Sequence, residues 1–148
     1  MDKRSQQKVR KFNWFYTTQL NLMNNHHLGS TTTLLEGRIM LEVSFGYNTL
    51  KQLVRILNLD KGYVSRTVKR LVDRGWLKQR RNQQDQRIQL LELTSLGQKI
   101  VREVDVYSNQ QVTNILGDLS KTELALVIKD MEEIQEVIER YHRIDFGK

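Results

Sequence analysis

Residues 49–94 have the sequence TLKQLVRILNLDKGYVSRTVKRLVDRGWLKQRRNQQDQRIQLLELT, and this stretch decides the fold. Apolar residues recur at intervals of three and four through its first half, which predicts two short amphipathic helices separated by a tight turn at 58–60. The second half predicts two strands, 76–81 and 87–93, joined by the polar linker 82–86. This order of elements indicates a helix-turn-helix followed by a β-hairpin wing.

Three capping boxes mark the starts of helices. In each box a Ser or Thr precedes a Glu or Gln by three residues, and the pairs are Thr33 with Glu36, Thr49 with Gln52, and Ser120 with Glu123. The boxes agree with the hydrophobic spacing, which predicts helices over about 33–43 and 49–57 and a last helix after the third box. A further helix is expected over 61–74, capped by Asp60 and closed by Gly75.

Long helices are predicted on both sides of this segment. Residues 5–27 have a wide apolar face with three consecutive aromatics at 14–16, so we expect this helix to form a subunit interface. Residues 94–116 carry Leu96 and Ile100 on one apolar stripe, and the last helix would pair with them in antiparallel fashion. A helix pair of this length has nothing else to cover it, so a second copy is the simplest partner.

Composition excludes several classes of protein. The 148 residues fit one domain and contain no cysteine, which excludes disulfides, thiolate metal sites and cysteine nucleophiles. No apolar run approaches the roughly 18 residues of a membrane span, and the first residues lack the apolar core of a signal peptide. We therefore expect a soluble, cytoplasmic protein that has no membrane partner.

The net charge of +7 is unevenly distributed. Residues 51–87 hold eleven Lys and Arg against three Asp and Glu, whereas residues 88–148 hold seven against eleven. A positive block in a mildly acidic frame indicates a polyanionic partner, because neutralised phosphates release their counterions. A merely solvated basic face is the alternative, and the position of the block on a helix-turn-helix favours DNA.

The exposed face of the helix at 61–74 carries side chains that suit a DNA major groove. Arg66 and Lys69 are expected to reach guanine edges, while Ser65 and Tyr63 would contact bases or phosphates. Each of these residues taken singly could be an ordinary exposed side chain. Their concentration on one helix face is what indicates base contact.

The hairpin tip and the helix start complete the predicted contact surface. Arg87 is placed to enter a minor groove, and Asp85 is expected to pair with Arg87 and orient it. Gly62 would let the helix backbone approach DNA closely. The predicted DNA-contacting residues are Thr49, Lys61, Gly62, Tyr63, Ser65, Arg66, Lys69, Arg70, Arg81, Asp85 and Arg87.

The order of elements and two motifs resemble the MarR (multiple antibiotic resistance regulator) family of bacterial transcription factors. Residues 85–97 contain D-x-R-x-x-x-L-x-L-T-x-x-G, which is similar to the signature of that family from the wing to the next helix. Residues 63–77 are similar to its recognition helix and following strand. The similarity covers nearly the whole chain and is most specific at 49–97.

This resemblance implies a mainly α-helical single domain over 1–148 with a small β-hairpin. Within it, a winged helix-turn-helix lobe at 31–97 would be flanked by dimerisation helices at 1–30 and 98–148. The implied function is that of a homodimeric repressor of a pseudo-palindromic, double-stranded DNA operator, without a cofactor. A small aromatic or amphipathic ligand would release it from a crevice between lobe and dimerisation helices. The candidate ligand contacts are Trp14, Tyr16, His27, Arg38 and Tyr47.

Three other functions compete with this one. An enzyme would need a converging nucleophile and base or paired carboxylates, and neither is evident in the sequence. A metal-responsive regulator could use His26, His27 and His142, although adjacent histidines at a helix end point in different directions. An architectural DNA-binding protein without an effector would bind random and promoter DNA with comparable affinity.

Overall fold

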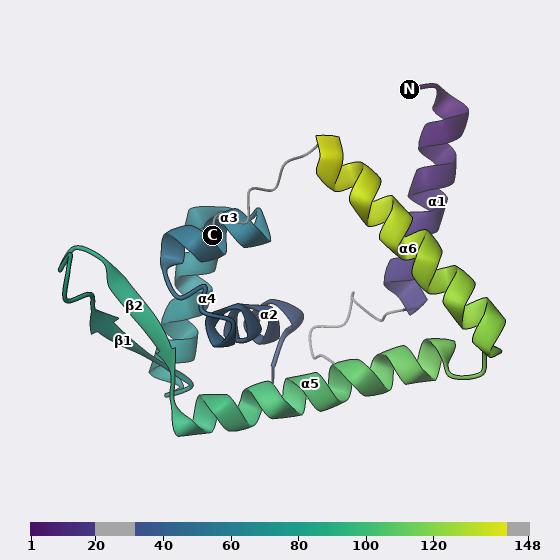
Figure 1. Ribbon diagram of the computed structural model, residues 1–148. Helices are drawn as coiled ribbons and strands as arrows, with labels where there is room; N and C mark the ends of the chain where they lie inside the picture. Colours follow the sequence, from purple (N-terminus) through teal and green to yellow (C-terminus); the bar gives the residue numbers. More distant parts are fainter. Residues whose placement is uncertain (20–31, 142–148) are drawn as a thin grey trace.

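The computed structural model describes residues 1–19 and 32–141. Its elements are α1 (Lys3–Gln19), α2 (Leu34–Ser44), α3 (Leu50–Leu57), α4 (Lys61–Asp73), β1 (Leu77–Arg81), β2 (Gln89–Leu93), α5 (Ser95–Leu116) and α6 (Lys121–Tyr141). Figure 1 shows α5 along the base of the molecule, with α2–α4 and the hairpin toward one end and α1 and α6 toward the other. The predicted class, mainly α-helical with a small hairpin wing, is confirmed.

All three predicted capping boxes form. The Thr33 hydroxyl accepts the Glu36 N–H, and the Glu36 carboxylate accepts the Thr33 N–H. The same reciprocal bonds join the residues of the other two boxes. Asp60 caps α4 by accepting the Tyr63 N–H at 2.9 Å, and Gly75 has the positive φ of +71° that ends this helix. The helix boundaries therefore follow local hydrogen-bonding signals.

The core lies where α2, α4, the base of the hairpin and the first half of α5 meet. Its buried apolar members are Ile39, Met40, Val43, Leu53, Val64, Val68, Leu71, Trp76, Leu77, Leu91, Ile100 and Val104. These side chains come from each element between α2 and α5, so the core fixes α4 and the hairpin relative to each other. This arrangement makes residues 32–104 a single lobe.

The hairpin is antiparallel, with Leu77 opposite Leu93 and Arg81 opposite Gln89. Alternation along β1 puts Arg81 on the same face as the buried Leu77, whereas Lys78 lies on the opposite face. On that opposite face the Glu92 carboxylate forms salt bridges with Lys78 Nζ at 3.2 Å and with Arg80 Nε at 2.7 Å. The Lys78 ammonium and the Arg80 guanidinium together lower the pKa of Glu92 below its ordinary value.

A close backbone contact joins the hairpin base to α5. The Thr94 hydroxyl donates to the Gly75 carbonyl at 2.6 Å and accepts the Gly97 N–H, while the Thr94 N–H donates to the Trp76 carbonyl at 3.1 Å. A Cβ atom at Gly97 would lie 2.0 Å from the Trp76 carbonyl oxygen. Only glycine fits at this position, which explains the final residues of the 85–97 motif in physical terms.

The outer helices differ from two expectations. Leu96 is 48% exposed, because the inward stripe of α5 starts at Gly97 and continues through Ile100 and Val104. The prediction that the last two helices form an antiparallel pair is also wrong for the single chain. Helix α6 diverges from α5, and none of its residues is buried (Figure 1). The end of the first predicted helix beyond residue 19 lies outside the described residues. No described helix has both the length and the apolarity that a bilayer crossing requires.

Candidate nucleic-acid interface

A groove of about 870 Å³ lies between α3, α4 and the hairpin. It is lined by Thr49, Leu50, Lys51, Val54, Lys61, Ser65, Val68, Lys69, Val72, Asp73, Gln79, Arg87, Ile88, Gln89 and Leu91. Apolar side chains form its floor because they belong to the faces that α3, α4 and β2 turn toward the core. The polar and cationic side chains of the lining come from the consecutive elements α3, α4, β1 and β2 and the turns next to them.

Helix α4 presents three different faces. Val64, Val68 and Leu71 are turned into the core, and Lys61, Ser65 and Lys69 form the flank beside the groove. Arg66 is exposed, and a Cβ atom at Gly62 would lie only 3.1 Å from its Nη1 atom. Gly62 thus leaves room for the Arg66 guanidinium beside the start of the helix.

The predicted cations differ in whether an acidic partner neutralises them. Lys61, Arg66, Lys69, Arg81 and Arg87 are exposed, and within residues 1–19 and 32–141 none of them forms an ion pair. Their positive charge is therefore available to an external anion. Lys61, Lys69 and Arg87 line the groove, whereas Arg66 and Arg81 are not part of its lining.

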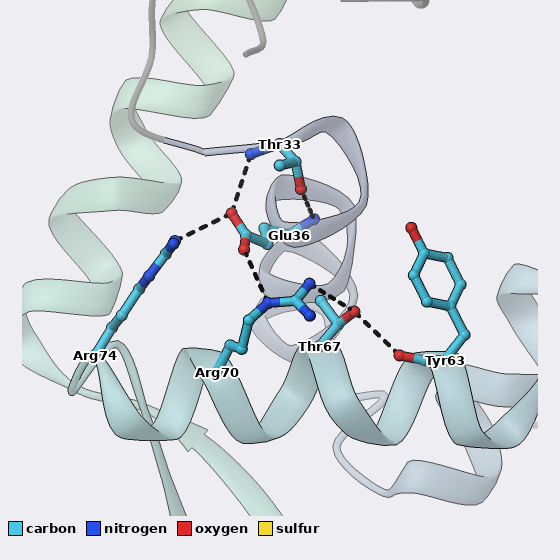
Figure 2. A network of polar contacts seen from close by, with 6 residues as sticks. All are labelled: Thr33, Glu36, Tyr63, Thr67, Arg70 and Arg74. Atoms are coloured by element: carbon cyan, nitrogen blue, oxygen red, sulfur yellow. Dashed lines mark hydrogen bonds and ion pairs between the residues drawn. The ribbon is translucent and has the colours of Figure 1, made fainter. Parts of the chain in front are cut away.

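Arg70 departs from this pattern. Its Nε lies 3.7 Å from the Glu36 carboxylate, which is 2% exposed, and its Nη2 donates to the Thr67 hydroxyl at 3.1 Å. Figure 2 shows Arg70 and Arg74 rising from successive turns of α4 toward Glu36. The sequence placed Arg70 with the DNA contacts, but the structure directs its guanidinium toward α2, because a buried carboxylate needs cationic partners.

Asp85 organises the hairpin tip through the backbone. Its carboxylate accepts the Arg87 N–H at 3.0 Å, and its carbonyl accepts the Ile88 N–H at 3.0 Å. The expected ion pair between the Asp85 and Arg87 side chains is absent from the described ion pairs of the hairpin. Asp85 therefore fixes the loop that carries Arg87 and leaves the guanidinium free.

Some groove residues were not predicted from the sequence. Thr49 was predicted, but its hydroxyl is engaged in the cap of α3, where it donates to the Gln52 side-chain oxygen at 2.9 Å. Lys51 lines the groove and was missed, although an exposed lysine in the first turn of the first helix of the motif was the available signal. Gln79 and Gln89 were also missed, and strand alternation from Leu77 and Leu91 would have placed them.

The candidate ligand contacts do not converge within one described chain. Trp14 is 69% exposed with the Arg10 guanidinium 5.7 Å from its ring, and Tyr16 stacks on Phe12. Both lie on α1, which stands apart from α2 in Figure 1. Arg38 is paired with Glu42 at 2.6 Å.

The other ligand candidates are less informative. Tyr47 is half-buried in the turn after α2, and His27 lies outside the described residues. The three histidines of the metal-site alternative also lie outside them. Within the part of the chain that the structure describes, no group of three His, Cys, Asp or Glu side chains is arranged to hold a metal ion.

Part of this lobe is similar to a known protein family. A family model described as the MarR family matches residues 40–88, which run from α2 through the hairpin tip. This match covers about a third of the chain and includes α3, α4 and β1. An uncharacterized HTH-type transcriptional regulator of Bacillus subtilis, YwoH, is 35% identical over 75 residues, covering 51% of this chain and 54% of YwoH.

Solved structures of other proteins share the fold of this chain. FabT of Streptococcus pneumoniae, solved in complex with DNA, has a TM-score of 0.76 at 20% identity and covers 93% of this chain and 99% of its own. A mutant MarR of E. coli, solved with operator DNA, has a TM-score of 0.69 at 22% identity, and the match covers 85% of this chain and 91% of the MarR chain. These likenesses confirm the winged helix-turn-helix fold.

The curated relatives limit the comparison in one respect. The chain spans about half the length of the curated relatives it matches. These relatives carry the name of transcriptional regulator.

Proposed function

We propose that the protein is a sequence-specific transcriptional repressor that binds a pseudo-palindromic, double-stranded DNA operator as a homodimer in the cytoplasm. The observation that carries this proposal is a set of five exposed cations on α4 and the hairpin that have no acidic partner among the described residues. They are Lys61, Lys69 and Arg87, which line the groove, and Arg66 and Arg81. The operator DNA bound by E. coli MarR and the DNA bound by FabT are consistent with it.

Each element would have its own part in binding. Helix α4 fits the width of a major groove, where Arg66 would make bidentate bonds to a guanine and Ser65 would contact a neighbouring base or phosphate. Arg87, held at the wing tip by the Asp85 loop, would enter the adjacent minor groove. Lys61 and Lys69 would contact phosphates, which position the lobe without reading sequence.

The outer helices support a two-fold dimer. No residue of α1 or α6 is buried. Exposed apolar side chains on α1, α5 and α6 include Val9, Phe12, Phe15, Val106, Leu126, Ile128, Ile134, Val137 and Ile138. A second copy would cover these side chains, and two-fold symmetry would place the two α4 helices in successive major grooves, about 34 Å apart.

We extend the proposal to release by a small aromatic or amphipathic effector. Because α5 runs from the wing base to the outer helices, a ligand wedged near α1 would change the spacing of the two lobes. The fold-decrease in operator affinity would be no larger than the ratio of the ligand's affinities for the two lobe spacings, the one that fits the operator and the one that does not. Trp14, an aromatic residue of α1 that is 69% exposed, is the side chain there that such a ligand would contact.

Three arginine variants test the DNA-binding surface. Arg66→Ala should weaken operator binding by about 1–3 kcal/mol and relax sequence preference at one position, because it removes a base contact. Arg87→Ala should weaken binding and reduce the salt slope by about one, because it removes a minor-groove cation. Arg102→Ala on the exposed side of α5 is the control, since it removes the same charge elsewhere.

The measurement is fluorescence anisotropy with a duplex recovered from a random pool and with a scrambled duplex, at several salt concentrations. If Arg66→Ala and Arg87→Ala bind both duplexes as Arg102→Ala does, the assigned surface is wrong. Equal binding of the parent to both duplexes would instead indicate an architectural protein.

A further inference from the structure

A buried carboxylate links the start of α2 to the last two turns of the recognition helix. Glu36 is 2% exposed, and its Oε2 atom accepts the Thr33 N–H at 3.0 Å and Arg74 Nη1 at 3.2 Å. Its Oε1 atom lies 3.7 Å from Arg70 Nε. One side chain thus closes the N-terminus of one helix and holds two arginines of another (Figure 2).

The two arginines are held on their other sides as well. The Arg70 guanidinium donates to the Thr67 hydroxyl, which in turn donates to the Tyr63 carbonyl at 3.0 Å. The Arg74 guanidinium lies 5.0 Å from the centre of the Trp76 ring. The contacts run along one face of α4 from Tyr63 to Arg74, so Glu36 anchors a connected polar row and not an isolated surface pair.

We propose that Glu36 is a positioning residue for sequence recognition, which fixes the roll of α4 about its axis and withdraws the charges of Arg70 and Arg74 from DNA. The inference rests on the proposed function and adds a residue that does not touch DNA. A roll of about 20° would move a side-chain tip at the helix surface by about 2 Å, since the helix radius with side chains is about 5–6 Å. Hydrogen bonds to base edges tolerate only a fraction of that displacement.

The second effect concerns charge. Arg70 and Arg74 keep about half of their side-chain surface exposed, so without Glu36 they would be free to turn toward phosphates. Phosphate contacts do not depend on the base sequence, so these arginines would raise the affinity for a scrambled duplex, while a rolled α4 would lose base contacts in the selected duplex. The ratio of specific to non-specific affinity would then fall, because base contacts would be lost while phosphate contacts were gained.

Glu36→Gln tests the inference because glutamine keeps the oxygen that caps α2 and removes the charge. Glu42→Gln is the matched control: Glu42 is also a buried acid on α2, at 4% exposure, but its ion pair is with Arg38 on the same helix. Relative to the control, Glu36→Gln should lose about tenfold or more in affinity for the selected duplex. Its affinity for a scrambled duplex should rise, with a salt slope steeper by about one to two.

Hydrogen exchange of the free protein gives a readout without DNA. Glu36→Gln should exchange faster than Glu42→Gln at the amides of α4. If Glu36→Gln does not fold, Arg74→Gln removes only one tether and should lower the affinity ratio without steepening the salt slope. Equal ratios, slopes and exchange rates in Glu36→Gln and Glu42→Gln would overturn the inference while the parent still prefers its selected duplex. Loss of that preference in the parent would overturn the proposed function itself.

Discussion

Gly97→Ala should destabilise the protein more than a glycine-to-alanine substitution near the start of any other described helix. The new Cβ atom would lie 2.0 Å from the Trp76 carbonyl oxygen, and Cβ atoms in proteins essentially never approach another atom closer than 3.0 Å. The first turn of α5 must therefore move away from Trp76. That movement would break the bonds of Thr94 to Gly75 and Trp76, each worth about 1 kcal/mol net.

The expected magnitude follows from these terms. Overpacking against backbone costs about 1–3 kcal/mol, and the higher helix propensity of alanine returns about 0.5–1 kcal/mol. Together with the lost bonds the net cost is about 3 kcal/mol. For a chain of this size it corresponds to a fall in Tm of about 10 °C.

The assay is thermal unfolding followed by circular dichroism, with all variants at one protein concentration because a dimer would make Tm concentration-dependent. Gly62→Ala is the matched control. It is also a glycine in the first turn of a helix, but its Cβ atom would meet only the ends of the Arg66 and Asp60 side chains, at 3.1 Å. Its Tm should stay within about 3 °C of the parent. A Gly97→Ala protein as stable as Gly62→Ala would refute the reasoning.

Further predictions concern the core, the wing and the outer helices. Leu53→Ala removes a fully buried side chain and should cost about 2–5 kcal/mol in urea unfolding. Glu92 has a lowered folded-state pKa, caused by Lys78 and Arg80, so its stabilising effect is present above the unfolded pKa and is lost as pH falls through the folded value. The difference in Tm between parent and Glu92→Gln should therefore be present at pH 7 and vanish in acid below the ordinary glutamate range. Ile134→Glu on the exposed face of α6 should shift the sedimentation coefficient from that of a dimer to that of a monomer, and an unchanged value would remove α6 from the proposed interface.

The elements that could be predicted are those fixed by neighbouring residues. The capping boxes at Thr33, Thr49 and Ser120 and the ends of α4 depend on hydrogen bonds between residues three apart, so the sequence contains the whole interaction. The exposed positions of Lys61, Arg66 and Lys69 on α4 followed from the helical period, which also acts locally.

The remaining features depend on residues far apart in the chain. Glu36 was recognised as a capping residue, but its bond to Arg74 spans 38 positions and could not be derived from spacing. The approach of Gly97 to Trp76 likewise depends on how α5 packs under the hairpin. The separation of α6 from α5 was missed because an apolar stripe indicates that a helix is covered without indicating by which chain.

The central claim is that the α4 and wing surface distinguishes one DNA sequence from others. The direct measurement is the affinity of the unmodified protein for the best duplex recovered from a random pool, divided by its affinity for a scrambled duplex of equal length at about 0.15 M salt. We predict a ratio of about a thousand or more, and two half-sites about 10 base pairs apart in the recovered sequence. A ratio near one would contradict the account.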